Sequence, residues 1–374
     1  MSVKRVPKAI LDNLEEIKEI DKSGMLSFCL KASEQYREAA KISRKLSIDY
    51  VKPRTIVIVG MGGSGIGGEL LKDWARDKVV VSIEVSREYS LPKYANKNTL
   101  AIIASYSGET EESLSAFLDA IKRKCMVFCV SSGGTLLQFA EKLSVPYLRI
   151  PSGMPPRAAL PYLFLPMLMI LDKTGLVSSV NSEFSEAIKI LETVSVENSP
   201  ENPVKDNFSK TLASNISGTV PVVYGFGFYR SVAQRFKQQF NENSKVPSKW
   251  ESFPELNHNE IVGWEGSDKL TKLFSTIFLR DRIEPEEIRY RIETTKELIS
   301  TESSKVFEVW SFGKGKLAKM LSTICVGDFA SVYLAVLRGV DPTPVKTITL
   351  LKEKMKQGGV KEKIIRNLQR IILK

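Results

Sequence analysis

The part of the sequence after residue 52 repeats one plan, in which a short apolar run leads through a turn into a helix-like segment. Apolar runs lie at 55–60, 79–85, 99–105, 125–131 and 145–150, and helix-like segments lie at 64–76, 110–123, 134–142 and 157–173. Short apolar strands that alternate with helices predict a parallel sheet covered by helices on both faces, because parallel strands need a crossover to return. This alternation therefore predicts an α/β fold.

The same alternation restarts after the polar stretch at 194–206. Strands are expected at 221–225, 273–279 and 306–312, and helices at 229–239, 284–299 and 314–337. We therefore expect two α/β domains, at 51–193 and 207–340. Helical segments are expected at both ends of the chain, at 1–50 and 341–374, because apolar residues recur there at helical spacing.

Composition limits the classes of protein to consider. The net charge of +11 would suit a nucleic-acid partner, but the basic residues are scattered along the sequence, so we expect no nucleic acid. An acidic small substrate would also be attracted by the positive field of such a protein. The four cysteines form no CxxC pair, which is typical of a cytoplasmic protein. The apolar run at 158–171 is short and contains two prolines, so a core helix is expected there rather than a membrane span.

The turn after the first apolar run reads GMGGSGIGG over residues 60–68. A strand that ends in a glycine turn at a helix start can bind an anion, because free backbone N–H groups and the positive helix end face the ligand. Gly60, Gly62 and Gly65 also fit the dinucleotide pattern, with Glu84 at the distance expected of a ribose-binding carboxylate. A third interpretation is that the glycines only permit a tight turn.

A second turn, SYSGET over residues 105–110, follows another apolar run and again precedes a helix. Together the two turns carry the hydroxyls of Ser64, Ser105, Ser107 and Thr110, which suits a phosphate monoester held by hydrogen bonds. The simpler interpretation of Thr110 is a helix N-cap, with the acidic residues after it complementing the helix dipole. The dinucleotide interpretation does not explain this second turn.

Three further residues are candidates for the chemistry. His258, the single histidine, excludes any site with several histidine ligands and is either a structural residue or a proton donor and acceptor near neutral pH. Glu242, between two asparagines, is either a solvated helix-end residue or a catalytic carboxylate. Arg157, after two prolines, is expected to open a helix, where its positive charge is explained better by an anion than by a surface role.

Six motifs in this order, IVIVGMGGSGIGG, SYSGETEE, SGMPPRAALPYLF, NENSKVP, PELNHNEIVGW and GVDPTPV, closely resemble the bifunctional phosphoglucose/phosphomannose isomerases. The resemblance runs from about Arg54 to Lys352. It implies two flavodoxin-like sugar-isomerase (SIS) domains, a homodimer, and interconversion of glucose 6-phosphate or mannose 6-phosphate with fructose 6-phosphate without cofactor or metal. The alternative is a non-catalytic SIS regulator that binds a sugar phosphate, although residues 1–50 show no clear DNA-binding helix-turn-helix.

The resemblance also implies a role for each site residue. The sugar phosphate would be bound by Gly63, Ser64, Ser105, Ser107 and Thr110. Arg157 would stabilise the enediolate, Glu242 would be the base, and His258 would assist ring opening in the site of the neighbouring subunit. Thr343 would leave room beside C3 of the sugar, and a C-terminal lysine is expected, namely Lys352 or its neighbours Lys346 and Lys354. Glu109 departs from the usual SYSGNTEE without affecting a catalytic position.

Overall fold

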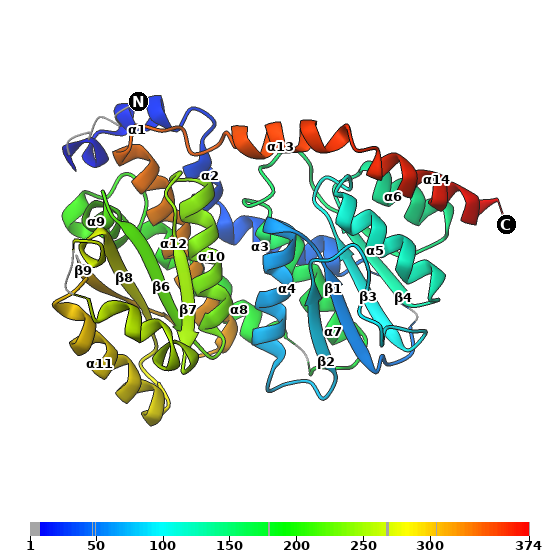
Figure 1. The fold of residues 1–374 in the computed structure, drawn as a ribbon, viewed down its shortest axis with the longest axis horizontal. Coiled ribbons are helices and arrows are strands. Elements are labelled where there is room, and N and C mark those ends of the chain that lie inside the picture. Colours follow the sequence, from blue (N-terminus) through cyan, green and yellow to red (C-terminus); the bar gives the residue numbers. More distant parts are fainter. Residues whose placement is uncertain are drawn as a thin grey trace. The chain divides into compact units, whose positions relative to one another are not determined.

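The computed structural model describes residues 8–46, 48, 50–178, 180–266, 269–303 and 305–373. The chain forms two compact units (Figure 1). One comprises Glu34–Val180 and Val345–Lys374, and the other comprises Met1–Ser33 and Asn181–Pro344. The domain boundaries expected from the sequence stay predictions. In the structure the compact units change at residues 33, 180 and 344.

The unit that contains Glu34–Val180 is built on a five-stranded parallel sheet of order β2-β1-β3-β4-β5. Its strands are β1 (Thr55–Val59), β2 (Ser82–Ser86), β3 (Thr99–Ala104), β4 (Met126–Ser131) and β5 (Tyr147–Arg149). The expected strand at 79–85 begins later than predicted, because Val80 lies exposed in the turn before it. The helices are α3 (Ala32–Ser43), which begins in the other unit, α4 (Gly62–Ala75), α5 (Glu111–Lys122), α6 (Gly134–Lys142), α7 (Leu160–Lys173), α13 (Lys346–Lys356) and α14 (Val360–Ile372).

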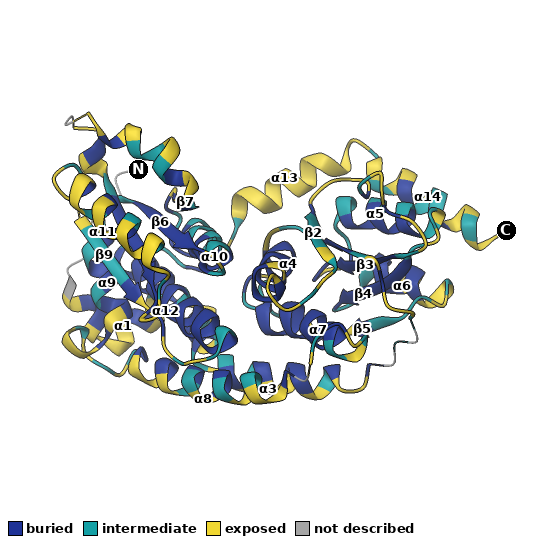
Figure 2. Ribbon diagram, turned by 90° about the horizontal axis from the view of Figure 1, so that it is seen from below, coloured by how far each residue is buried: buried dark blue, intermediate teal, exposed yellow. Residues whose placement is uncertain are grey.

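Alternate side chains of this sheet pack against different helices. Val57, Ile103 and Cys129 face a core to which α5, α6 and the C-terminal helix α14 contribute. On the opposite face α4 packs over Ile58 of β1 and against α7. The central strands β3 and β4 are buried along their whole length and are dark blue in Figure 2, whereas β2 and β5 at the two edges of the sheet are largely half-buried or exposed. This is the doubly covered parallel sheet predicted from the alternation of strands and helices.

The other unit holds a four-stranded parallel sheet of order β7-β6-β8-β9. Its strands are β6 (Val220–Phe226), β7 (Lys249–Phe253), β8 (Phe274–Arg280) and β9 (Lys305–Trp310). Helices α10 (Tyr229–Glu242) and α12 (Lys316–Leu337) pack together, and α11 (Glu286–Ser300) contacts β7 and β9. The remaining helices are α1 (Leu14–Ile20), α2 (Met25–Leu30), α8 (Asn181–Glu197) and α9 (Phe208–Ile216).

Strand β7 was not predicted from the sequence. It reads KWESF, and most of its residues are half-buried or exposed because it forms the edge of the sheet. An edge strand needs neither a continuous apolar run nor clean alternation, so the usual sequence signal is weak. Helices α8 and α9 were not predicted either. They lie around the polar stretch at 194–206, which separates the two predicted domains.

The two sheets share one topology, since β7-β6-β8-β9 repeats the order β2-β1-β3-β4. The first crossover matches in detail as well. A Cβ at Gly60 would lie 2.9 Å from the backbone carbon of Ser64, and one at Gly225 would lie 2.4 Å from the backbone oxygen of Tyr229. In both cases a glycine allows the strand to approach the residue four positions later. The α/β class predicted from the sequence, with two parallel sheets, is thereby confirmed.

Among the described residues, α12 is the one helix long and apolar enough to cross a membrane. However, 94% of its most apolar window is buried inside the unit. A Cβ at Gly327 in its middle would lie 2.4 Å from the ring of Phe236, so α12 packs tightly on α10. Burial against α10, α8 and α9 accounts for its apolar composition.

Candidate functional site

The glycine turn closes tightly on itself between β1 and α4. A Cβ at Gly65 would lie 2.4 Å from the carbonyl oxygen of Gly60, and Gly62 has a φ of 49°, a conformation that side chains rarely adopt. A side chain at Gly65 would therefore clash with the backbone, and one at Gly62 would have open space but a strained backbone conformation. The N-cap residue of α4, Met61, makes no side-chain capping hydrogen bond, so the helix start can present backbone N–H groups and its positive end to an anion.

Hydroxyl groups join the glycine turn to the second turn. The Oγ of Ser64 accepts a hydrogen bond of 3.1 Å from the backbone N–H of Tyr106, and the Oγ of Ser105 donates to Oγ1 of Thr110 over 3.1 Å. Ser107 is exposed and accepts from the N–H of Glu109 at 3.2 Å. The structure thus brings the four predicted hydroxyls to the carboxyl ends of the adjacent strands β1 and β3.

Thr110 is the N-cap residue of α5 by position, but its hydroxyl makes no capping hydrogen bond. It pairs with Ser105 instead. The capping role weighed from the sequence is therefore not the role of this side chain. Because α5 also begins without a side-chain cap among the described residues, two uncapped helix starts flank one hydroxyl cluster, which is an arrangement suited to an anion.

Arg157 is brought to the glycine turn by its backbone. A Cβ at Gly63 would lie 2.7 Å from the carbonyl oxygen of Pro156 and 3.1 Å from the N atom of Arg157. The Tyr106 hydroxyl accepts a 2.8 Å hydrogen bond from the N–H of Met154 in the same segment. Arg157 is 2% exposed. Helix α7 begins only at Leu160, so Arg157 lies in the turn before the helix rather than at its first residue.

A lysine that was not singled out from the sequence links the backbone at Glu242 to the backbone at Pro342, the residue before Thr343. Helix α10 continues to Glu242, beyond the predicted end at 239. The Nζ of Lys245 donates to the carbonyl oxygen of Glu242 and, at 2.8 Å, to that of Pro342. Thr343 is half-buried, and its N–H donates to the Asp341 carboxylate at 3.0 Å.

The asparagines beside Glu242 brace the turn that follows it. Asn243 donates to the Ser331 hydroxyl of α12 at 2.9 Å, and the Ser244 hydroxyl donates to the Ser331 carbonyl oxygen at 2.6 Å. Asn241 accepts from the N–H of Ser248 at 3.0 Å. The half-buried Glu242 side chain therefore extends from a helix end that is anchored on both sides.

His258 is exposed and ends a short 3-10 helix, Glu255–His258. The loop around it is anchored, because Asn257 donates to Thr295 at 2.8 Å and the Trp264 indole donates to the Tyr224 hydroxyl at 3.0 Å. Lys352 is exposed on α13, and so are Lys346 and Lys354. The three candidate lysines thus lie exposed on one helix.

Known proteins resemble this chain over most of its length. The bifunctional phosphoglucose/phosphomannose isomerase of Caldicellulosiruptor bescii is 41% identical over 326 residues, which cover 86% of this chain and 96% of the relative. The chain belongs to the bifunctional phosphoglucose/phosphomannose isomerase family. The relative of the same name from Aquifex aeolicus is 33% identical over 83% of this chain and 92% of its own.

Two further findings agree with this family. Residues 205–355 match the model described as the bacterial phospho-glucose isomerase C-terminal SIS domain. The crystal structure of a glucose-6-phosphate isomerase like protein from Thermus thermophilus superposes with a TM-score of 0.60 over 92% of this chain and 98% of the other, at 19% identity. That likeness supports the fold, and the sequence relatives carry the family assignment.

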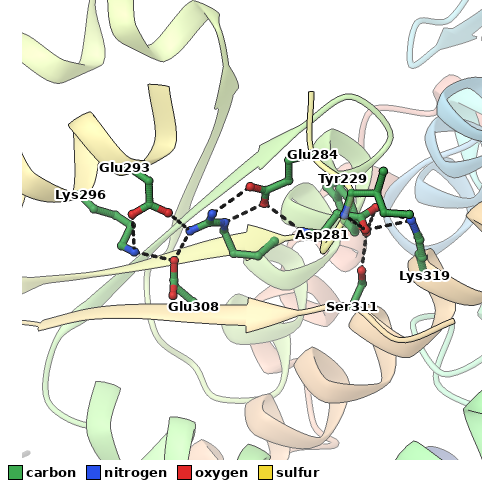
Figure 3. A network of polar contacts seen from close by, with 10 residues as sticks. Tyr229, Asp281, Glu284, Glu293, Lys296, Glu308, Ser311 and Lys319 are labelled. Carbon is green, nitrogen blue, oxygen red and sulfur yellow. Dashed lines mark hydrogen bonds and ion pairs between the residues drawn. The ribbon is translucent and has the colours of Figure 1, made fainter. Parts of the chain in front are cut away.

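In the second SIS domain, other side chains lie where the first domain has Ser64 and the hydroxyls of residues 105–110. Tyr229 stands at the position equivalent to Ser64, is fully buried, and lies 3.1 Å from the Asp281 carboxylate and 2.6 Å from the Ser311 hydroxyl (Figure 3). Lys319 donates to both oxygens of Asp281, at 2.9 and 2.7 Å. Because the hydroxyl of Tyr229 and the carboxylate of Asp281 bond to each other after strands β6 and β8, we expect only the first domain to hold phosphate.

The dinucleotide interpretation finds little support in the same structure. Glu84, the candidate ribose-binding residue, accepts a hydrogen bond from the Tyr94 hydroxyl, and burial together with that carboxylate raises the pKa of Tyr94. The similar family members also carry names of sugar-phosphate isomerases. The glycine turn is better interpreted through the hydroxyl cluster that it joins.

Proposed function

We propose that this protein is an aldose–ketose isomerase that interconverts glucose 6-phosphate and mannose 6-phosphate with fructose 6-phosphate through a cis-enediol. The observation that carries the proposal is the hydroxyl cluster of Ser64, Ser105 and Thr110 between two uncapped helix starts, with Arg157 packed beside it. The family relatives support the same reaction. A remote phosphate bound in this way orients the reacting carbons of the sugar.

The proposed mechanism needs one base that acts on one face of the open-chain sugar. Glu242 removes the proton from C2 of the aldose while the C1 carbonyl oxygen gains a proton, which forms the enediol. The same carboxylic acid then delivers its proton to C1 while the hydroxyl at C2 loses one, which forms the ketose. Arg157 stabilises negative charge on the enediolate oxygens.

The remaining roles belong to the same proposal. Gly63, Ser64, Ser105, Ser107 and Thr110 hold the phosphate, and Lys352 or a neighbouring lysine assists. His258 assists ring opening in the site of a neighbouring subunit, which requires a homodimer, and its exposure on an anchored loop is compatible with that role. A cytoplasmic location and a place in glycolysis or gluconeogenesis complete the proposal.

A coupled assay on the purified protein tests the reaction. We expect turnover of both glucose 6-phosphate and mannose 6-phosphate, with kcat/KM measured for each, and the same rates after dialysis against a chelator, because the proposed acid–base groups are side chains. Tight binding of fructose 6-phosphate without turnover would instead favour the non-catalytic regulator. A thermal shift with NAD in place of fructose 6-phosphate would support the dinucleotide interpretation.

Replacing Thr343 with glutamine should suppress turnover of mannose 6-phosphate far more than turnover of glucose 6-phosphate. The two sugars share one enediol and differ in the face of C2 that receives the proton, so the second epimer needs rotation about C2–C3 and space beside C3. The ratio of the two kcat/KM values is the measurement, and Thr294→Gln on the exposed face of α11 is the matched control. Equal losses for both sugars would mean that Thr343 supports the fold rather than the choice of epimer.

A further inference from the structure

The second phosphate-binding turn contains a carboxylate at a place where a phosphate dianion would disfavour one. Glu109 lies between Ser107 and Thr110, and like charges at short range repel. Its side chain is turned toward α6. One carboxylate oxygen accepts from the N–H of Thr135 at 2.7 Å, and the Thr135 hydroxyl lies 2.9 and 3.1 Å from the two oxygens. Glu109 thus caps the first turn of α6.

The other partner of Glu109 comes from the C-terminal helix. Lys361, in the first turn of α14, forms an ion pair with the second carboxylate oxygen. Burial by itself would raise the pKa of Glu109, but the contacts with Lys361 and Thr135 outweigh it and lower the pKa, so the carboxylate stays charged and matched. Lys361 is held in place because Ile364 and Leu368, one and two turns later, are buried in the core beneath α5 and α6.

The turn that holds Glu109 is interlocked with the turn before α6. The N–H of Leu136 donates to the carbonyl oxygen of Gly108 at 2.9 Å, and the Ser132 hydroxyl donates to that of Tyr106 at 2.7 Å. A Cβ at Gly108 would lie 2.0 Å from the carbonyl oxygen of Gly133, so the two turns are in direct backbone contact. Glu109 itself is tied to the hydroxyl turn, because its N–H donates to Oγ of Ser107 at 3.2 Å and Thr110 follows it directly in the chain.

We propose that Lys361 is a positioning residue for phosphate binding, which neutralises Glu109 and holds it against α6 so that residues 105–110 can accept a sugar phosphate. This inference rests on the proposed function of that turn. It makes the docked C-terminal helix a part of substrate recognition, although α14 lies more than two hundred residues along the chain from the turn. Lys361 should affect the affinity for the sugar phosphate rather than the chemical step, because its contact is with Glu109 and it has no proposed part in the reaction.

The test compares Lys361→Met, Glu109→Gln and the double variant. Lys361→Met leaves an unmatched carboxylate beside the phosphate, so we expect KM for glucose 6-phosphate to rise about tenfold, with kcat within about twofold of wild type. Adding Glu109→Gln removes that carboxylate and should bring KM back to within about threefold of wild type. Lys363→Met, which changes an exposed lysine of the same helix, should leave both parameters unchanged.

Calorimetric binding of glucose 6-phosphate to each variant provides a readout that does not depend on turnover. The inference is supported if Lys361→Met weakens binding and the added Glu109→Gln restores it. This result would support the inference even if the wild type binds the sugar phosphate without isomerising it. A KM unchanged in Lys361→Met, a loss that Glu109→Gln does not restore, or a wild type that binds no sugar phosphate would overturn it. A purely structural role of Lys361 would lower the melting temperature of both Lys361 variants and give no such restoration.

Discussion

Replacing Glu242 with glutamine should lower kcat by several orders of magnitude and leave the affinity for sugar phosphate nearly unchanged. Glutamine keeps the size of the side chain but cannot take and return a proton, so the loss falls on the chemical step. The end of α10 is anchored to α12 through Asn243 and Ser244, so the substitution should not disturb the helix end. The measurement is kcat and KM in a coupled assay, with Glu287→Gln on the exposed start of α11 as the control.

Ser64→Ala gives the opposite pattern and separates the two roles. The Ser64 hydroxyl accepts from the N–H of Tyr106 and belongs to the phosphate cluster, so its loss should weaken binding by about 1–3 kcal/mol with a smaller effect on kcat. Comparing the two variants distinguishes a base from a binding residue. If Glu242→Gln retains more than about a tenth of the wild-type kcat, the base lies at another residue.

Replacing Arg280 with methionine should lower the free energy of unfolding by about 3–5 kcal/mol, because it leaves carboxylates without their buried partner. Arg280 lies at the end of β8, is 2% exposed, and makes paired contacts of 2.7 and 2.8 Å with Glu284. Arg280 also forms ion pairs with Glu293, at 2.7 Å, and with Glu308, and both glutamates are labelled in Figure 3. Burial opposes its charge, but these carboxylates outweigh it and raise the pKa of the guanidinium.

Equilibrium unfolding in urea measures this effect. Lys18→Met is the matched control, because Lys18 forms a 2.9 Å ion pair with Glu15 in which both side chains are largely exposed, and such pairs contribute about 0–1 kcal/mol. Adding Glu284→Leu to Arg280→Met should recover part of the loss, since it removes the most buried of the unmatched carboxylates. A loss from Arg280→Met no larger than that from Lys18→Met would contradict a stabilising role for the network.

Elements with a clear signal in their own residues were predicted, and elements without one were missed. Strands β1, β3 and β4 were predicted because each is a continuous apolar run buried on both faces, and the glycine and hydroxyl turns follow them directly in the sequence. Strand β7 was missed because an edge strand exposes one side and carries polar residues. The segment around Arg157 was predicted as a helix start, but proline geometry places a turn there and the helix begins at Leu160.

The sequence by itself determined the α/β class, the repeated crossover and the set of hydroxyls at the two turns, because strand, turn and helix signals act between neighbouring residues. Only the tertiary structure decided which groups face one another. The close approach of Gly63 to Arg157, the hydrogen bond from Lys245 to Pro342, and the pairing of Lys361 with Glu109 join residues far apart in the chain. Those pairings depend on how helices pack on a sheet, and no local pattern of residue types encodes the partner across such a distance.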